Sequence, residues 1–411
     1  MILSFITNPN HKTNKLYILI IVFLSLVFST LLFTPITKIQ AHNGSNYLFK
    51  TKQNQHVTIT PTSHPTAVPT PTPTVPADPT VTQTPSTTQR VNPVCVSSHL
   101  NNIPQSDVDT QTTLMQQAGV KWVRFNLVWG NVEQTRGVYD WSSYDYIVNN
   151  INSKGMHVLG LVTQWGAPSW ERTDASNWMS PANNPTDFGN FVQALATHYK
   201  GKISLYEIGN EPNWTKFWPP APNVQAYTQL LIAGYNGIKA ADPTDKVISG
   251  GLTVSDNDGG MTYLQDMYND GAKNHFDYLG FHPYSWPSSP DVGYGWGLSS
   301  LDNIRSVMVQ NNDLKQIIAT EFGWPSTIAS GGVDETTQAN YINLMYQNIE
   351  YGNYQYVPIA CVYDFGDDGT DTTNPEDNFG IVRSDYSAKP AYATLQQVEQ
   401  NYNANFTQIN P

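Results

Sequence analysis

Residues 203–242 read ISLYEIGNEPNWTKFWPPAPNVQAYTQLLIAGYNGIKAAD, and this stretch holds the unit that decides the fold. Its first part, ISLYEIGNE, is a short apolar run of strand character that stops at Asn210, Glu211 and Pro212. Its last part, residues 223–242, spaces its apolar residues at the helical period. A buried strand followed by an amphipathic helix is the building unit of a parallel sheet that is covered by helices.

The same strand–helix unit recurs eight times along the chain. The predicted strands lie within residues 93–98, 121–129, 156–165, 203–211, 246–252, 276–285, 314–324 and 357–369. Eight such units predict an α/β fold, the closed (β/α)8 TIM barrel. The alternative, a doubly wound open sheet, usually has a Gly-rich turn after its first strand. The corresponding stretch here, VCVSSHLNN at residues 94–102, contains no glycine, which favours the barrel.

Two segments of different composition precede the predicted barrel, which occupies residues 93–411. Residues 1–42 hold basic residues followed by an apolar run, Leu16 to Phe33, which is typical of a signal peptide or a membrane anchor; both remain open. Residues 43–92 are rich in Pro and Thr, and this composition predicts a linker that stays extended and builds no core. We therefore expect a protein that is secreted, or tethered by its N-terminal segment to the extracellular face of the cell membrane.

The composition narrows the classes of partner. The 411 residues include 21 Lys and Arg against 33 Asp and Glu, so the net charge is −12 and no basic stripe for nucleic acid is present. The two cysteines, Cys95 and Cys361, match no metal-binding spacing. They lie on the first and last predicted strands, which become neighbours when a barrel closes. We expect them to be close in space, either as a disulfide or as two free thiols.

The carboxyl ends of the predicted strands carry the polar residues of a site, because TIM-barrel chemistry takes place at this face. Glu211 ends the fourth strand and Glu321 ends the seventh, so two carboxylates point into one mouth. The other candidate site residues at or just beyond strand ends are Arg124, Trp129, Trp165, Asn210, His282, Tyr284, Trp324 and Tyr363. Two carboxylates in one cleft are what glycoside cleavage needs, and Asn210 is placed to hydrogen-bond a sugar 2-OH. This chemistry implies neither a cofactor nor a metal.

Other residues near the strand ends have plainer explanations. Glu207 lies below the mouth, so we expect a structural role, and Glu133 is expected to pair with a cation or a backbone amide. The aspartates that follow the eighth strand lack the spacing of a calcium loop, and we expect a solvated loop there. These aspartates are Asp364, Asp367, Asp368 and Asp371.

Tryptophans gather in the predicted loops that follow the strands. Flat indole faces stack on the C–H faces of sugar rings at a low cost of ordering. Such a concentration at one end of a barrel predicts an extended glycan cleft. The tryptophans concerned are Trp129, Trp165, Trp170, Trp178, Trp214, Trp218, Trp286, Trp296 and Trp324.

Several motifs resemble a known group of enzymes. YEIGNEPN and IATEFGWPS resemble the acid/base and nucleophile strands of the retaining glycoside hydrolases of clan A. VRFNLVWGNVEQTRGVYDW is similar to the second-strand region of that clan, and GFHPYS to its sixth-strand His-x-Tyr. The resemblance covers the whole predicted barrel and is nearest to family 39 or family 5, while TEFGWPS is also similar to family 17 β-1,3-glucanases.

The resemblance implies a role for each matching residue. Glu211 would be the general acid/base and Glu321 the nucleophile, while Arg124 would keep Glu321 ionised. Tyr284 would hydrogen-bond Glu321, and His282 would help to shape the subsite at the cleaved bond. Asn210 would bind the sugar 2-OH, and Tyr363 is the candidate for the sugar contact on the eighth strand.

The sequence therefore predicts a monomeric enzyme that hydrolyses O-glycosidic bonds in a β-linked polysaccharide or oligosaccharide by a retaining mechanism. Its carboxyl groups, Glu211 and Glu321, are expected to lie about 5–5.5 Å apart. Two alternatives stay open. A transglycosylase would use the same covalent intermediate, and a non-catalytic barrel would only bind glycans.

Overall fold

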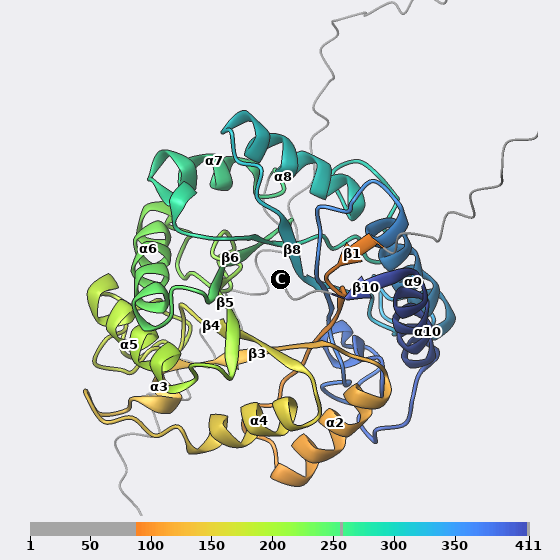
Figure 1. Cartoon of the computed structure of the whole chain (residues 1–411), viewed down its shortest axis with the longest axis horizontal. Helices are drawn as coiled ribbons and strands as arrows, with labels where there is room; N and C mark the ends of the chain where they lie inside the picture. Colours follow the sequence, from red (N-terminus) through yellow and green to blue (C-terminus); the bar gives the residue numbers. More distant parts are fainter. Residues whose placement is uncertain (1–87, 255–257, 409–411) are drawn as a thin grey trace, which may run out of the picture. The chain divides into compact units, whose positions relative to one another are not determined.

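The computed structural model describes residues 88–254 and 258–408. Eight parallel strands close into a barrel in their order along the chain, and helices surround them (Figure 1). The barrel strands are β2 (Val94–Ser97), β3 (Trp122–Leu127), β4 (His157–Val162), β5 (Ile203–Asn210), β6 (Lys246–Thr253), β7 (Leu279–His282), β8 (Ile317–Phe322) and β9 (Ala360–Val362). The predicted (β/α)8 TIM barrel is confirmed, and closure excludes the open doubly wound sheet.

Helices follow the strands as the apolar spacing predicts. The main helices are α2 (Gln105–Gln117), α4 (Ser142–Ser153), α5 (Pro185–His198), α6 (Val224–Ala241), α7 (Met261–Asn269), α8 (Leu298–Gln310), α9 (Glu335–Tyr351) and α10 (Pro390–Asn405). Shorter helical turns are α3 (Trp129–Val132), η1 (Ala272–Asn274) and η2 (Pro375–Asn378). No helix within the described ranges is long and apolar enough to cross a membrane.

Local sequence explains where the helices begin. The side chain of Asn184 accepts a hydrogen bond from the Thr186 backbone at the start of α5, and Pro185 occupies the first turn. Asp334 caps α9 in the same way by accepting from the Thr337 backbone. Both helices then bury an apolar face against the barrel.

Barrel closure joins β2 to β9, and the first and last strands are paired in register at Cys95 and Cys361. These two residues form a disulfide, so the prediction that they are neighbours is confirmed. Of the two alternatives, a disulfide or two free thiols, the structure has the disulfide. The apolar layer inside the barrel includes both cysteines together with Trp122, Leu205 and Ile318. A separate, larger apolar cluster fills the space between strands and helices.

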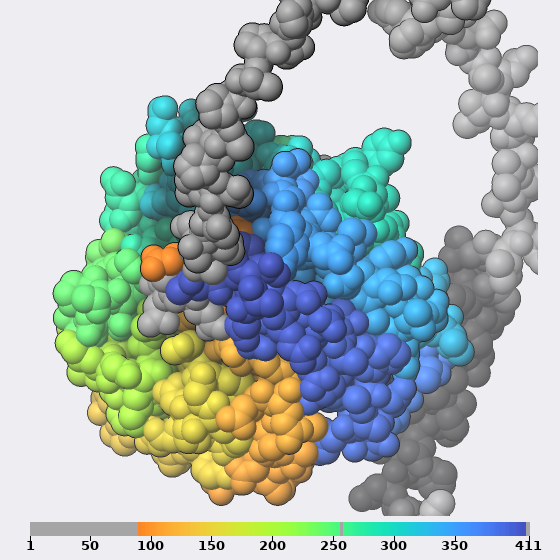
Figure 2. Space-filling view, turned by 45° about the vertical axis from the view of Figure 1, so that its right-hand side comes forward, coloured from red at the N-terminus to blue at the C-terminus, as the bar shows by residue number. Residues whose placement is uncertain are grey.

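The ends of the folded part also meet. β1 (Thr88–Arg90) pairs in parallel with β10 (Phe406–Gln408), although residues up to 92 were predicted to be linker. The strand is too short and too polar to show as an apolar run, which is why the sequence pattern missed it. Figure 2 shows the early orange part of the chain against the deep blue C-terminal part, and Tyr392 of α10 donates a hydrogen bond to the Leu114 carbonyl of α2. The predicted signal or anchor segment, 1–42, and nearly all of the predicted linker lie outside the described residues.

Candidate active site

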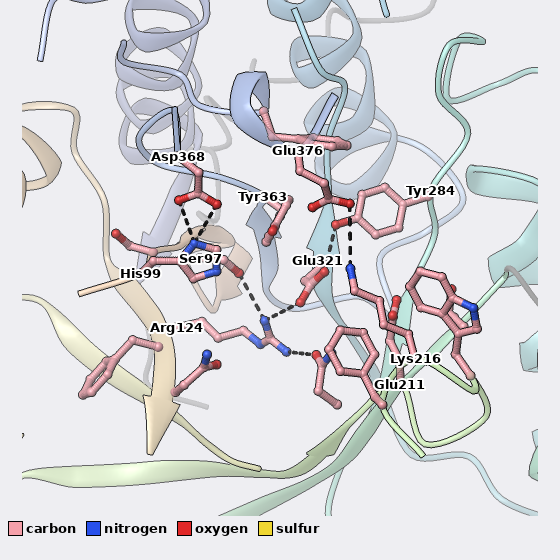
Figure 3. Close-up of a pocket in the computed structure, with 18 of the residues that line it drawn as sticks. Ser97, His99, Arg124, Glu211, Lys216, Tyr284, Glu321, Tyr363, Asp368 and Glu376 are labelled. Atoms are coloured by element: carbon pink, nitrogen blue, oxygen red, sulfur yellow. Dashed lines mark hydrogen bonds and ion pairs between the residues drawn. The ribbon is translucent and has the colours of Figure 1, made fainter. Parts of the chain in front are cut away.

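A cavity of about 580 Å³ lies at the carboxyl ends of the barrel strands, where the sequence predicts the site (Figure 3). Arg124, Asn210, Glu211, Tyr284 and Glu321 all line it, although they come from different strands and the loops that follow them. The structure therefore brings together the polar residues that a parallel barrel should gather at this face.

The end of β5 is held in an unusual backbone conformation. Gly209 has a φ of 91° and Glu211 a φ of 43°, both in the left-handed region. The positive φ at Gly209 favours glycine at this position, and a Cβ atom there would also make a tight contact of 3.0 Å with the Tyr227 ring. Strained backbone of this kind persists only where neighbours fix it, and it concentrates at functional sites.

Neighbouring strands supply that fixation. The Gln164 side-chain amide accepts a hydrogen bond from the Asn210 N–H and donates one to the Asn210 carbonyl, each at 2.8 Å. The Glu211 N–H donates to the Gly251 carbonyl on β6 at 2.9 Å. Asn210 and Glu211 are thus clamped from β4 on one side and β6 on the other, which fixes where the Glu211 carboxyl group points.

Glu211 is buried beside a histidine. Nδ1 of His282 lies 2.8 Å from Oε1 of Glu211, and Nε2 of His282 lies 3.1 Å from the Thr320 hydroxyl. Burial raises the pKa of Glu211 above its ordinary value, and the nearby Glu321 adds to this, although His282 opposes both. Burial lowers the pKa of His282, but Glu321 and Glu211 outweigh it, so the imidazolium form is favoured.

Glu321 has the opposite environment. Arg124 Nη1 lies 2.7 Å from its Oε1, and the Tyr284 hydroxyl donates to its Oε2 at 2.8 Å. Burial raises the pKa of Glu321, but His282, Arg124 and the Tyr284 hydroxyl together hold it below the ordinary value. The pKa values of the two buried glutamates therefore shift in opposite directions. The surroundings of Glu211 favour the neutral acid, and those of Glu321 favour the carboxylate.

The two carboxyl groups are close. An oxygen of Glu211 and an oxygen of Glu321 lie within 4.8 Å of each other, and both face Nδ1 of His282. This separation fits the close pair of carboxyl groups, about 5–5.5 Å apart, that attack and protonate one glycosidic bond. It is shorter than the separation of about 6.5–9.5 Å that leaves room for a water between them.

Arg124 organises the floor of the cavity. Its Nε donates to Oε2 of Glu207 at 2.6 Å, and its Nη2 donates to Oδ1 of Asn210 at 2.8 Å. Because a guanidinium can only donate, this contact requires the Asn210 amide oxygen to face Arg124 and turns the NH2 group to other acceptors. Glu207 also accepts from the Gly251 N–H, so it supports Arg124 from below and has the structural role predicted for it.

Three of the tryptophans predicted for the glycan cleft are in the core instead: Trp129, Trp218 and Trp324. Trp129 is buried, stacks on Phe191 with ring centres 5.1 Å apart, and donates its N–H to Glu133 at 2.6 Å. Trp324 is equally buried and donates its N–H to the Ser288 carbonyl. None of the three lines the cavity, so the prediction that they contact sugar is corrected. Trp129 packs on Phe191 of α5 and Trp324 packs on Tyr341 of α9, and a strand-end position alone does not reveal that.

The remaining predicted residues divide between the cavity wall and the layer behind it. Trp165 and Tyr363 line the cavity, as do Trp214, Trp286 and Trp296 from the predicted glycan cleft. His282 is fully buried and acts through Glu211, so it does not form part of the wall. Glu133 accepts from the Gly137 backbone N–H, in line with the pairing expected for it.

The sequence patterns did not predict a polar cluster in the wall of the cavity that contains His99 and Asp368. His99, which follows β2, faces Asp368 at 2.8 Å and Asp364 at 3.2 Å. Burial lowers the pKa of His99, but the two aspartates raise it to about 9. Asp364 is buried, and Asp367 pairs with Lys389 at 2.6 Å, so the solvated loop predicted here is only partly correct. The one available signal was a polar residue directly after the first strand.

Among the residues that the structure describes, two groups bring potential metal ligands within 4.8 Å of one another: Glu211, His282 and Glu321, and His99, Asp364 and Asp368. In both groups a histidine nitrogen already faces carboxylate oxygens at hydrogen-bonding distance. Ion pairing within the protein therefore accounts for each arrangement.

Comparison with solved structures agrees with the fold. A family 39 glycoside hydrolase from the gut symbiont Bacteroides cellulosilyticus WH2 superposes with a TM-score of 0.60 at 24% identity, over 75% of this chain and 64% of that protein. A monomeric β-xylosidase from Caulobacter crescentus CB15 gives 0.57 at 18% identity, over 75% and 68%. An exo-β-1,4-mannosidase from Opitutaceae bacterium strain TAV5 gives 0.55 at 16%, over 75% and 59%. This chain thus spans less than two thirds of the first and third of these proteins.

A family profile carries the comparison further. The profile described as cellulase (glycosyl hydrolase family 5) matches residues 84–358, well over half of the 411 residues. The match includes β2 to β8, and with them both glutamates of the cavity. The chain therefore belongs to glycosyl hydrolase family 5, a clan A family, and is a glycoside hydrolase.

Proposed function

We propose that this enzyme hydrolyses O-glycosidic bonds in a β-linked polysaccharide or oligosaccharide by a retaining double displacement. The observation that carries the proposal is the pair Glu211 and Glu321, whose oxygens lie within 4.8 Å of each other while their pKa values shift in opposite directions. Two carboxyl groups at this separation, one protonated and one ionised, match the needs of that reaction.

In the first step, an oxygen of the Glu321 carboxylate forms a bond to the anomeric carbon as the bond to the leaving oxygen breaks. Glu211 donates its proton to that leaving oxygen, so no alkoxide has to form. In the second step, Glu211 accepts a proton from water, the water oxygen bonds to the anomeric carbon, and the bond to Glu321 breaks. The Asn210 NH2 group is oriented to hydrogen-bond the sugar 2-OH during both steps.

The β-linkage is supported by two of the similar structures, which are described as a β-xylosidase and an exo-β-1,4-mannosidase. We also propose that the catalytic domain acts as an exported monomer. The Cys95–Cys361 disulfide fits an oxidising compartment, and the apolar N-terminal segment fits export.

The test is a panel of aryl β-glucosides, xylosides and mannosides together with soluble β-glucans, mannans and xylans. Proton NMR of the first product should show the substrate's anomeric configuration, whereas inversion would refute the mechanism. Glu321→Gln should lower kcat/KM by on the order of a thousandfold or more on every substrate. Glu335→Gln, which removes a carboxylate that pairs with Arg383 on the outer surface, should leave turnover intact. Products longer than the substrate at high substrate concentration would identify the enzyme as a transglycosylase instead.

A further inference from the structure

The loop between β7 and α8 contains a tight turn with an unusual residue at its tip. Residues 292–297 read VGYGWG, and Gly293 pairs with Trp296 in an antiparallel bridge. Between them Tyr294 has a φ of 58° and Gly295 a φ of 85°. Two central residues with positive φ define a type I′ turn, which normally carries Asn, Asp or Gly at both positions.

Neither folding nor packing explains a tyrosine at this position. A bulky side chain is unfavourable in the left-handed region, so Tyr294 works against the turn that it occupies. It also gains nothing from burial, because 96% of its surface is exposed. An aromatic residue that is both strained and fully exposed points to a function.

The turn is rigid. The Ser299 hydroxyl accepts a hydrogen bond from the Gly295 N–H at 3.0 Å and donates one to the Trp296 carbonyl at 2.8 Å. At the base of the turn, the Gly297 N–H donates to the Tyr284 carbonyl at 3.1 Å. Because the backbone is already held in place, little conformational entropy is lost when its aromatic side chains bind a ligand.

The turn is also continuous with the catalytic cavity. Trp296, two residues after Tyr294, lines the cavity and is 46% exposed. Trp286, from the same loop, lines it as well and is 39% exposed. Tyr284, to which the base of the turn is bonded, donates its hydroxyl hydrogen to Glu321. Two exposed tryptophans of this loop thus line the cavity that holds Glu321, and Tyr294 lies two residues from one of them in the chain, outside the lining.

We propose that Tyr294, which lies outside the lining of the catalytic cavity, and Trp296, which lines it, form an aromatic binding site for the sugar rings of a long β-linked polysaccharide whose scissile bond lies at Glu211 and Glu321. The proposal rests on the proposed function and specifies its substrate as an extended chain. Sugar rings are the occupant because they offer apolar C–H faces to the aromatic rings and keep their hydroxyls in water. A protein partner with an apolar face is the competing occupant.

The test uses the Glu321→Gln enzyme, which can bind a chain without cleaving it. Native gels are run with and without hydroxyethylcellulose, glucomannan, arabinoxylan or mixed-linkage β-glucan. At least one polymer should slow the migration of the Glu321→Gln protein in the gel. In the double variant Glu321→Gln, Tyr294→Ala, this retardation should be at least fivefold weaker. Tyr351→Ala is the matched control, since Tyr351 is also an exposed tyrosine (51%) but lies at the end of α9. It should leave the retardation unchanged.

A second variant separates binding from folding. Tyr294→Asn places a residue that suits the turn, so its melting temperature should be equal to or above that of the parent enzyme while polymer retardation falls. In the active enzyme, Tyr294→Ala should lower kcat/KM on the retarding polymer at least fivefold relative to kcat/KM on an aryl β-glycoside.

The outcomes are distinct. If no polymer retards Glu321→Gln, or if Tyr294→Ala and Tyr294→Asn bind polymer as the parent does, the binding site is refuted, even when aryl glycosides are cleaved. If Tyr294-dependent retardation occurs but no glycoside of any kind is cleaved by the active enzyme, the binding site stands and the proposed reaction fails.

Discussion

Nδ1 of His282 lies 2.8 Å from Oε1 of Glu211, and both side chains are buried. The same nitrogen lies 3.6 Å from Oε2 of Glu321, so one imidazole faces both carboxyl groups. As a cation it lowers the pKa of each of them. The pH range over which Glu211 is protonated while Glu321 is ionised therefore depends on this histidine.

We predict that His282→Asn moves the whole pH profile of kcat/KM upward. The asparagine amide can still donate to Glu211, but it carries no charge, so the pKa of both carboxyl groups should rise. The acid limb follows ionisation of Glu321 and the alkaline limb follows deprotonation of Glu211, so both limbs should move to higher pH. Thr320→Val, which removes only the partner of Nε2, should move them less. Limbs that stay in place would show that His282 carries no charge.

We predict that the loss in kcat/KM caused by Glu211→Gln depends strongly on the leaving group of the substrate. Without its acid, the first step must expel the leaving group unaided, which is hard for a sugar hydroxyl and easy for a dinitrophenolate. The loss in kcat/KM should therefore be about 10²–10⁴-fold on an oligosaccharide and far smaller on a dinitrophenyl glycoside. Equal losses on both substrates would argue against the acid role of Glu211.

Sequence patterns are sufficient to predict the barrel and to predict that polar residues on its strands meet at one face. Arg124, Asn210 and Glu321 lie on β3, β5 and β8 and line one cavity, because parallel strands in a closed barrel leave their carboxyl ends together. No tertiary information was needed for that conclusion. The same logic explains why Cys95 and Cys361 were expected to be neighbours.

The contacts made by loop residues could not be predicted in this way. His99 meets Asp368 across a separation of 269 residues, and no local pattern reports such a pairing. Trp129 begins the short helix α3, which turns its indole into the core, so its position just after a strand was misleading. Side chains on strands inherit their direction from the sheet, whereas side chains on loops take theirs from packing that only the folded chain reveals.

The Cys95–Cys361 disulfide joins the two strands at which the barrel closes, across a separation of 266 residues. A cross-link over such a long loop restricts the unfolded chain strongly. We predict that replacing both cysteines by alanine lowers the free energy of unfolding by about 2–4 kcal/mol. Chemical denaturation with and without reductant measures this. Turnover of the folded variant should be unchanged, because both cysteines lie inside the lower barrel layer, away from the cavity.

Glu350 in α9 provides a test of stability outside the site. It is buried, its Oε1 makes no hydrogen bond with any residue that the structure describes, and burial raises its pKa to about 7 despite opposing effects of Tyr351 and Arg90. A carboxyl group whose pKa is higher in the folded state than in the unfolded state favours folding while it is protonated. That contribution is fully present below pH 4.5, the ordinary value, and is lost as the pH rises through about 7.

We predict that Glu350→Gln raises the free energy of unfolding at pH 8 by on the order of 2 kcal/mol and changes it little at pH 4. Glutamine keeps the shape of the protonated glutamic acid and removes the charge that must be buried at high pH. Denaturation at several pH values gives both curves, and they should converge on the acid side. Glu399→Gln is the control, because Glu399 pairs with Lys121 at 2.8 Å and its loss should not stabilise the protein at pH 8. A destabilised Glu350→Gln protein at pH 8 would mean that Tyr351 and Arg90 stabilise the carboxylate more than burial disfavours it, and the assignment of Glu350 as an acid that favours its protonated form would be wrong.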